Sequence, residues 1–280
     1  MVTRLITAAI GIVIALIVLF LHNTVVLPIA AGVVSVMLIF EYMRANNLLR
    51  YHLSAITAFL YAMTLPLIQG SFIARYRSML TVAAFACVLF DYVRHQKKMQ
   101  EKTLFAIIAG MFMIPTAITA AVILNNTHEQ HGLAYLVLAL GGAWFADSGA
   151  YFVGSALGRQ KLCPAISPKK TVAGFIGAIC TDVVFFLIFS GVYCSIMTHK
   201  DVPVNMSVNW FATILIAMVC AVLATLGDLA ASTLKRQLDL KDFSNIMPGH
   251  GGLLDRFDSV LLVLPFFAAF VQATNFFELS

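Results

Sequence analysis

No charged residue interrupts TLFAIIAGMFMIPTAITAAVIL, which occupies residues 103–124. A helix of about 20 mostly apolar residues is long enough to cross the hydrocarbon core of a membrane. Similar apolar runs recur along the whole chain, and together they predict about nine membrane-spanning helices. These cover residues 5–21, 24–41, 53–70, 78–93, 103–124, 132–157, 171–197, 208–231 and 254–276.

The composition supports the same fold class. Of the 280 residues, 61% are hydrophobic and only 11% are charged, and the mean hydropathy is +0.92. Soluble domains carry about 25% charged residues, so this chain has too few charges to cover a globular surface. We predict an all-α polytopic membrane protein that forms a single integral-membrane domain over residues 1–280. Within it, residues 1–130 are expected to form a helical scaffold for lipid or dimer contacts, and residues 131–280 the helices and loops that carry the chemistry.

The cysteines indicate neither a disulfide framework nor a zinc site. None of the five forms a CxxC pair or lies in a Cys/His cluster with metal-ligand spacing. Four of them lie in apolar runs, where cysteine behaves as a small hydrophobic residue. The five cysteines are Cys87, Cys163, Cys180, Cys194 and Cys220.

The distribution of positive charge predicts the orientation. With the N-terminus in the cytoplasm, all of the 18 lysines and arginines except Arg75, Arg77 and Lys200 fall at the cytoplasmic ends of the predicted spans. Basic residues collect on that side of membrane proteins. We therefore predict a cytoplasmic N-terminus and a C-terminus on the outer side. The net charge of +5 is explained by this topology, and no nucleic-acid partner is expected.

The first of three polar motifs places an acidic residue inside the predicted span 132–157. Asp147 is followed by Tyr151 four residues later, so the two share a helix face. A carboxylate in the membrane is costly and usually functional; the alternative is a structural hydrogen bond to a neighbouring helix. The same span has small residues every four positions, which favours close approach of another helix more than a ligand groove. They are Gly142, Ala146, Ala150, Gly154 and Gly158.

A second motif precedes the predicted span 171–197. Ser167 and Pro168 are typical of an N-cap and a first helical residue, so we predict that a helix starts here. Lys169 and Lys170 would then lie in its first turn, where the helix dipole disfavours cations. Phosphate beside these lysines and the hydroxyl of Thr171 would offset that cost. The alternative is a positive-inside anchor beside lipid headgroups.

The third motif is the richest in polar residues. Asp228, Ser232 and Lys235 share one stripe of a helix by their spacing. The loop at residues 248–252, PGHGG, is flexible enough for its backbone amides to approach an anion, and the span that follows would place Asp255 and Ser259 on one face. Carboxylates, basic clusters and a glycine-rich turn can together hold a divalent cation and a polyphosphate. The alternative is an ordinary cytoplasmic loop with ion pairs.

Residues 232–258 resemble the signature of phosphatidate cytidylyltransferases, also called CDP-diacylglycerol synthases. Ser-x-Leu-Lys-Arg is followed by Lys-Asp and then by Pro-x-His-Gly-Gly-Leu-x-Asp-Arg-Phe-Asp. Residues 147–151 and 167–171 look like the upstream motifs of that family, in the same order. The departures are Met247, Ala173 and Ser155, which stand where the family usually has another aliphatic or aromatic residue, Glu and Arg, respectively.

The resemblance implies a reaction of CTP with phosphatidate that gives CDP-diacylglycerol and pyrophosphate in phospholipid biosynthesis. It also implies a bacterial inner-membrane protein whose active site faces the cytoplasm, with membrane lipids around it. The resemblance does not decide whether the protein forms a homodimer. Two alternatives remain. A CTP-dependent lipid kinase would use similar groups, and a secondary transporter would also need intramembrane carboxylates.

The resemblance assigns expected roles to the motif residues. Asp228 and Asp255 would hold Mg²⁺, with a second cation left open. The groups expected to neutralise phosphate charge are Lys235, Arg236, Lys241 and Arg256, assisted by Lys169 and Lys170. The other expected substrate-binding residues are Asp147, Ser167, Thr171, Ser232 and Asp258. The residues expected to shape the phosphate loop are Gly249, His250, Gly251 and Gly252.

Overall fold

The computed structural model of the chain describes residues 2–69, 72–127, 131–199, 206–247, 251–274 and 276–279. Its helices are α1 (Val2–Phe20), α2 (Val26–Ala45), α3 (His52–Ile68), the 3₁₀ helix η1 (Phe72–Tyr76), α4 (Arg77–Arg94), α5 (Glu101–Thr127), α6 (Gly132–Leu157), α7 (Val172–His199), α8 (Trp210–Gln237), α9 (Leu254–Phe257) and α10 (Val260–Ala273). Its short strands are β1 (Lys161–Cys163), β2 (Ser167–Thr171), β3 (Met206–Val208) and β4 (Phe277–Leu279).

Long apolar helices dominate the described chain, which confirms the all-α polytopic class. Six of them are long and apolar enough to cross a membrane: α2, α4 extended back to Ala74, α5, α6, α7 and α8. The apolar part of α1 and the whole of α3 are shorter. The count of nine spans and the orientation of the termini stay predictions.

The last predicted span, 254–276, is wrong as a single helix. It is divided into α9 and α10 by a turn at Asp258 and Ser259. The Asp258 carboxylate accepts a hydrogen bond from the Ser259 backbone N–H at 2.8 Å, and such local side-chain bonds compete with continuous helix. Asp255 and Ser259 therefore lie on either side of a break and not on one helix face.

The chain forms two compact units. The first unit contains Met1–Asn126 and Gln237–Phe257, and the second contains Thr127–Arg236 and Asp258–Ser280. The sequence-based division at residue 130 kept the whole C-terminal half together, whereas the structure joins Gln237–Phe257 to the N-terminal helices. The predicted site residues are thereby distributed over both units.

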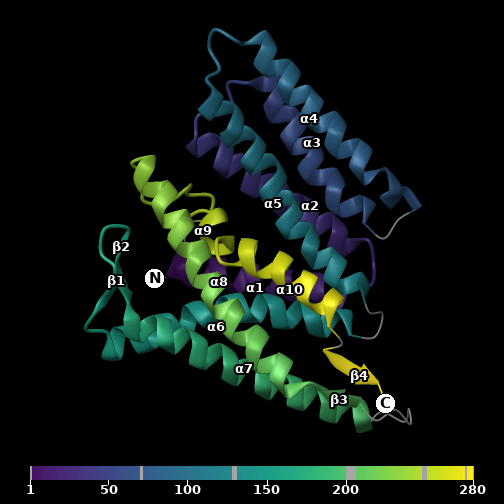
Figure 1. Ribbon diagram of the computed structural model, residues 1–280, viewed down its shortest axis with the longest axis vertical. Coiled ribbons are helices and arrows are strands. Elements are labelled where there is room, and N and C mark those ends of the chain that lie inside the picture. The colour runs from purple at the N-terminus through teal and green to yellow at the C-terminus, as the bar shows by residue number, and fades with distance from the viewer. Residues whose placement is uncertain are drawn as a thin grey trace. The chain divides into compact units, whose positions relative to one another are not determined.

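In the first unit, α2, α3 and α4 pack against one another in sequence order (Figure 1). Gly110 of α5 allows close packing, because a Cβ there would lie 2.3 Å from the Tyr42 ring. The Tyr42 hydroxyl donates to the Ala106 carbonyl at 3.0 Å. Two carboxylates, Glu41 and Asp91, are completely buried among these apolar helices. Both have hydrogen-bond partners, described below.

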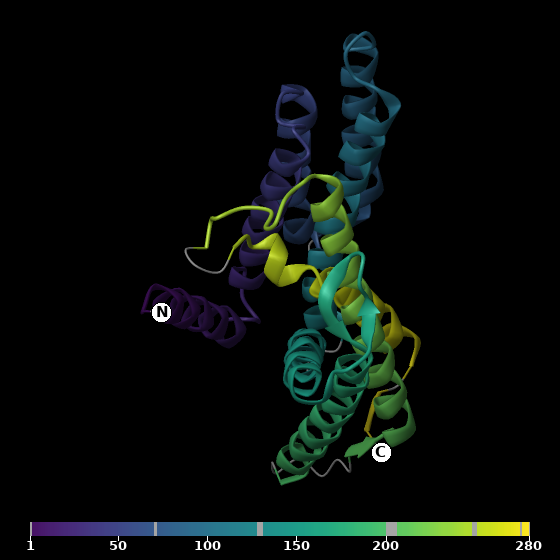
Figure 2. The same cartoon turned by 90° about the vertical axis from the view of Figure 1, so that its left-hand side faces the viewer.

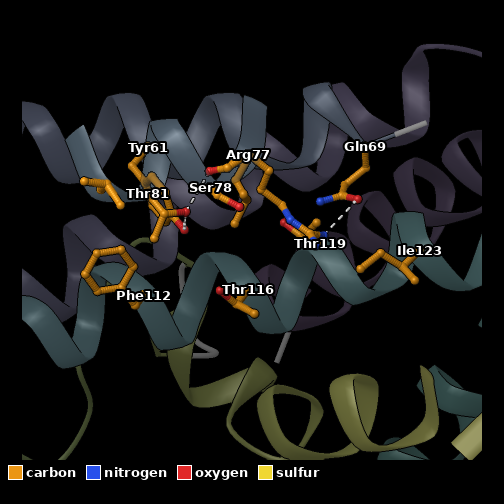
Figure 3. A pocket seen from close by; sticks show the side chains of 11 residues that line it. Tyr61, Gln69, Arg77, Ser78, Thr81, Phe112, Thr116, Thr119 and Ile123 are labelled. Carbon is orange, nitrogen blue, oxygen red and sulfur yellow. Dashed lines mark hydrogen bonds between the residues drawn. The ribbon is translucent and has the colours of Figure 1, made fainter. Parts of the chain in front are cut away.

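A polar-lined pocket of about 520 Å³ opens among α3, α4 and α5 (Figure 3). Arg77 donates to the Gln69 side-chain oxygen at 3.5 Å, and the hydroxyls of Tyr61 and Thr81 lie 3.3 Å apart. Phe112 also lines this pocket. None of the predicted site residues lines it.

In the second unit, α6 and α7 run side by side (Figures 1 and 2). Gly154 and Gly174 face each other, and a Cβ on Gly174 would lie only 2.7 Å from the Ala150 carbonyl oxygen. The close helix approach predicted from the small-residue stripe is confirmed. α10 packs on α6, and β3 pairs with β4 in antiparallel fashion.

The prediction of a helix start at Ser167 is wrong. Residues 167–171 form β2, which pairs antiparallel with β1, so that Lys161 lies opposite Thr171 and Cys163 opposite Ser167. α7 begins only at Val172, and the Thr171 hydroxyl oxygen accepts the Gly174 backbone N–H at 3.1 Å. Thr171 therefore caps the helix, and Lys169 and Lys170 precede it on a hairpin that joins α6 to α7 (Figure 1).

Candidate functional site

Lys170 of the hairpin forms an ion pair with Asp228 of α8 in the second unit. The Lys170 Nζ atom lies 2.7 Å from Asp228 Oδ2 and donates to the Thr225 carbonyl at 3.3 Å. The two side chains are 19% and 31% exposed, respectively, so the pair is partly shielded from solvent. The anion that the lysine motif was expected to need is thus provided by the protein itself.

The second oxygen of Asp228 is also engaged. Ser232, one helical turn later on α8, donates its hydroxyl to Asp228 Oδ1 at 3.2 Å. This contact confirms that Asp228 and Ser232 share one stripe, as their spacing predicts. Lys235 and Arg236 follow in the last turn of the helix.

A second polar contact forms where α6 meets the start of α10, and it joins Asp147 and Asp258 through Ser259. The Ser259 hydroxyl donates to Asp147 Oδ2 at 2.7 Å and lies 3.2 Å from Asp258 Oδ1. Asp258 and Ser259 are 8% and 1% exposed, whereas Asp147 is exposed. The carboxylate predicted to be functional is therefore accessible, and it is oriented by a buried serine.

These groups act on one another electrostatically. The carboxylates of Asp228 and Asp147 both repel that of Asp258, and Lys235 attracts it. We call Asp147, Asp228 and Asp258 the carboxylate cluster. Residues from all three sequence motifs, Asp147, Lys170 and Asp228, therefore lie in the second unit at or beside this cluster.

In the first unit, the Asp255 side chain accepts hydrogen bonds from backbone amides of the loop that precedes it. Asp255 Oδ2 accepts the backbone N–H groups of Phe243 and Gly252, each at 3.0 Å. The Gly252 amide, predicted to face a phosphate, is thus bonded to a protein carboxylate. Gly251 has a φ of +83°, a conformation that glycine adopts at little cost. Lys241 and Arg256 are exposed, whereas Gly249 and His250 lie outside the described residues.

Glu41 of α2 is a residue that the sequence reasoning missed. Its buried carboxylate accepts the backbone N–H groups of Leu253 and Leu254, at 2.9 and 2.6 Å, and the hydroxyl of Ser244. A Cβ on Gly252 would lie 2.8 Å from Glu41 Oε2, so only glycine fits there without a shift. Glu41 therefore anchors the segment that leads into Asp255.

A second missed carboxylate is Asp182 of α7, which is fully buried. Within the part of the chain that the structure describes, neither of its oxygens has a hydrogen-bond partner. Both Glu41 and Asp182 lie in apolar runs. The rule that a carboxylate in such a run is functional or paired, which singled out Asp147, would have found them too.

The oxygen donors of the carboxylate cluster can be compared with those that the predicted magnesium site requires. Across the described ranges, no group of three or more His, Cys, Asp or Glu side chains is arranged to hold a metal ion. Mg²⁺ commonly uses only one or two carboxylates and completes its shell with water and substrate phosphates. The oxygen donors of the cluster suit that chemistry, and their mutual repulsion would be reduced by a divalent cation.

Comparison with known proteins assigns the chain to a family. The sequence profile described as "Cytidylyltransferase family" matches residues 2–274. The chain belongs to this family. Its relatives include proteins named phosphatidate cytidylyltransferase: that of Bacillus subtilis (strain 168) is 46% identical over 138 residues, 49% of this chain and 47% of the relative. That of Staphylococcus epidermidis (strain ATCC 12228 / FDA PCI 1200) is 39% identical over 139 residues, 49% of this chain and 48% of the relative.

A third relative has the same extent of similarity. The phosphatidate cytidylyltransferase of Staphylococcus aureus (strain COL) is 37% identical over 139 residues, 49% of this chain and 48% of the relative. The chain thus spans about half the length of the curated relatives it matches. Family membership confirms the resemblance found in the motifs.

Proposed function

We propose that the chain transfers the cytidylyl group of CTP to phosphatidate, giving CDP-diacylglycerol and pyrophosphate. The observation that supports this most is the gathering of Asp147, Lys170 and Asp228, one from each sequence motif, in the second unit of a cytidylyltransferase-family chain. The names of the relatives support phosphatidate as the acceptor. Neither alternative, a lipid kinase or a transporter, is favoured by the family.

The chemistry needs positioning and charge neutralisation more than covalent assistance. A phosphate oxygen of phosphatidate forms the new bond to the α-phosphorus of CTP, and the bond from that phosphorus to the bridging oxygen of the pyrophosphate breaks. Lys170, Lys235 and Arg236 would balance the negative charge of the phosphates. Binding of substrate phosphate to Lys170 would compete with its ion pair to Asp228, so the pair would open or be shared as substrate enters.

We also propose Mg²⁺ as the cofactor. Asp228 would hold it, with Asp147 and Asp258 as the neighbouring carboxylates. Asp255 belongs to the other unit, and its role as a magnesium ligand stays a prediction. When bound, the cation would neutralise the triphosphate and stabilise the leaving pyrophosphate.

The proposal is tested by identifying which lipid accepts the transferred group and which phosphate product is released. Purified protein incubated with CTP, magnesium and phosphatidate should produce pyrophosphate and a lipid diphosphate diester, both visible by ³¹P NMR. Diacylglycerol in place of phosphatidate should give no reaction. Formation of CDP with phosphorylation of diacylglycerol would instead identify a CTP-dependent lipid kinase and contradict the proposal.

We infer that the chain lies in a bacterial inner membrane with the hairpin and the end of α8 facing the cytoplasm. The distribution of basic residues supports this orientation. In a background without the five native cysteines, Asn126→Cys and Lys161→Cys, both at exposed positions, should label from opposite sides of the membrane. Labelling from the same side would show that α6 does not cross the membrane.

Lys170→Gln should lower kcat/KM about tenfold or more, equivalent to about 1.4 kcal/mol of transition-state stabilisation. The ion pair also makes a stability prediction, because the variant leaves Asp228 without its cation. The Tm should therefore fall slightly, whereas lysines in the first turn of a helix would have predicted an unchanged or higher Tm. Lys161→Gln, which changes an exposed lysine of β1 outside the candidate site, is the matched control. Unchanged kinetics in Lys170→Gln would show that the lysine serves only as a membrane anchor.

A further inference from the structure

A separate basic pocket lies in the first unit, at the ends of α3 and α4. It is a hollow of about 460 Å³ lined by Arg50, Tyr51, His95 and Lys98. Arg50 and Tyr51 directly precede α3, and His95 and Lys98 directly follow α4. None of the motif residues of the candidate site lines it, so this headgroup-sized hollow is independent of the carboxylate cluster.

The Tyr51 ring forms the floor of the pocket and is held in place by contacts from both chain segments. Tyr51 is 3% exposed, and its hydroxyl donates to the Lys98 carbonyl oxygen at 3.2 Å. The Arg50 guanidinium carbon lies 5.0 Å from the centre of the Tyr51 ring, and the His95 ring meets the same ring edge-on at 5.8 Å. Tyr51 therefore ties the two sequence segments that carry the cations to one another.

A buried carboxylate orients the histidine. Asp91 is fully buried, and His95 Nδ1 lies 3.0 Å from its backbone carbonyl oxygen and 2.9 Å from its Oδ1. Asp91 Oδ2 accepts the backbone N–H and the hydroxyl of Ser54. Because Nδ1 is engaged by Asp91, Nε2 is the ring nitrogen left for a ligand. The imidazole is thus held in place by a network that lies beneath the pocket.

The two cations of the pocket have no acidic counterpart. Of the carboxylates in the described ranges, none lies within 4.0 Å of the charged groups of Arg50 or Lys98. Exposed Arg44, Arg94 and Lys97 add to the positive field on the same two chain segments. In the pocket of Figure 3, by contrast, the one cation, Arg77, is bonded to Gln69. A basic hollow at the ends of membrane helices is typical of anionic headgroup recognition.

We propose that this pocket binds the phosphate group of an anionic membrane lipid, at a site separate from that of the transferase reaction. Arg50 makes forked hydrogen bonds to phosphate oxygens, Lys98 adds a point charge, and the protonated form of His95 donates from Nε2. The volume is within the range of about 300–1,000 Å³ that is usual for ligand pockets.

Binding of dioctanoyl phosphatidylglycerol to the full chain in a nonionic detergent tests the proposal, without CTP present. The double variant Arg50→Gln/Lys98→Gln should weaken binding about tenfold or more, because two charge-assisted hydrogen bonds are lost. The charge-preserving variant Arg50→Lys/Lys98→Arg should bind within a few-fold of the wild type. Lys97→Gln, which removes a neighbouring exposed charge outside the pocket, is the control and should weaken binding far less than the double variant does.

Two further arms identify the source of the phosphate. Dioctanoyl phosphatidylcholine, whose headgroup is zwitterionic, should bind more weakly than phosphatidylglycerol. Competition by inorganic phosphate would assign the pocket to phosphate from either source, and lack of competition would assign it to the lipid headgroup. Should the double variant fail to fold, each single variant should still weaken binding. Equal affinity of the wild type and of the folded glutamine variants for phosphatidylglycerol would overturn the proposal and leave the transferase assignment untouched.

Discussion

Asp228→Asn should reduce cytidylyl transfer by about 100-fold or more. The substitution keeps the shape of the side chain but removes its negative charge. That charge pairs with Lys170 at 2.7 Å, and the other carboxylate oxygen accepts the Ser232 hydroxyl at 3.2 Å. It also removes the carboxylate proposed to hold Mg²⁺. Steady-state kinetics with CTP and phosphatidate, on protein purified at matched yield, measures the effect.

Asp239→Asn is the matched control for this variant. Asp239 follows α8, is exposed and has a φ of 54°, a conformation that asparagine also tolerates. Its activity should stay within twofold of the wild type, since removing an exposed charge alone has little effect. Full activity of Asp228→Asn, with a normal Tm, would remove Asp228 from the site.

Glu41→Gln should produce the second large loss. An amide in place of the buried carboxylate presents an N–H₂ donor to backbone groups that are themselves donors, so at least one of the contacts to Ser244, Leu253 and Leu254 is lost. Hydrogen bonds to a charged acceptor contribute about 1.5–3 kcal/mol each. We expect a lower Tm together with a fall in turnover of about tenfold or more, because the segment that carries Asp255 loses its anchor.

The control for this variant is Glu101→Gln, which changes an exposed glutamate at the start of α5. Its Tm and turnover should match the wild type. As a separate check of the position, Gly252→Ala should mimic Glu41→Gln, because its Cβ would lie 2.8 Å from Glu41 Oε2. Wild-type Tm and turnover in both Glu41→Gln and Gly252→Ala would contradict the anchoring role.

Features that depend on the geometry of one helix could be predicted from the sequence. The i, i+4 spacing placed Ser232 beside Asp228, and the small-residue stripe of α6 predicted close approach of another helix, which the structure identifies as α7. Both follow from helix geometry alone. The apolar runs likewise located the membrane helices to within a few residues in most cases.

Contacts between distant segments could not be predicted in this way. Glu41 reaches Leu254 across 213 positions, and no spacing rule connects them. Ser167 and Pro168 look like a helix start because their local preferences favour one, yet pairing with β1 overrides those preferences. Proline is tolerated in such a short two-stranded hairpin, where one side of each strand is unpaired.

The fate of the phosphates of CTP tests the central claim most directly. Parallel reactions with phosphatidate should contain CTP labelled with ³²P at either the α- or the γ-phosphate, and the lipid and aqueous phases should be counted separately. Cytidylyl transfer predicts α-label in the lipid and γ-label in aqueous pyrophosphate, with neither transfer in Asp228→Asn. Label from the γ-phosphate in the lipid, or α-label that stays in the aqueous phase, would contradict the account.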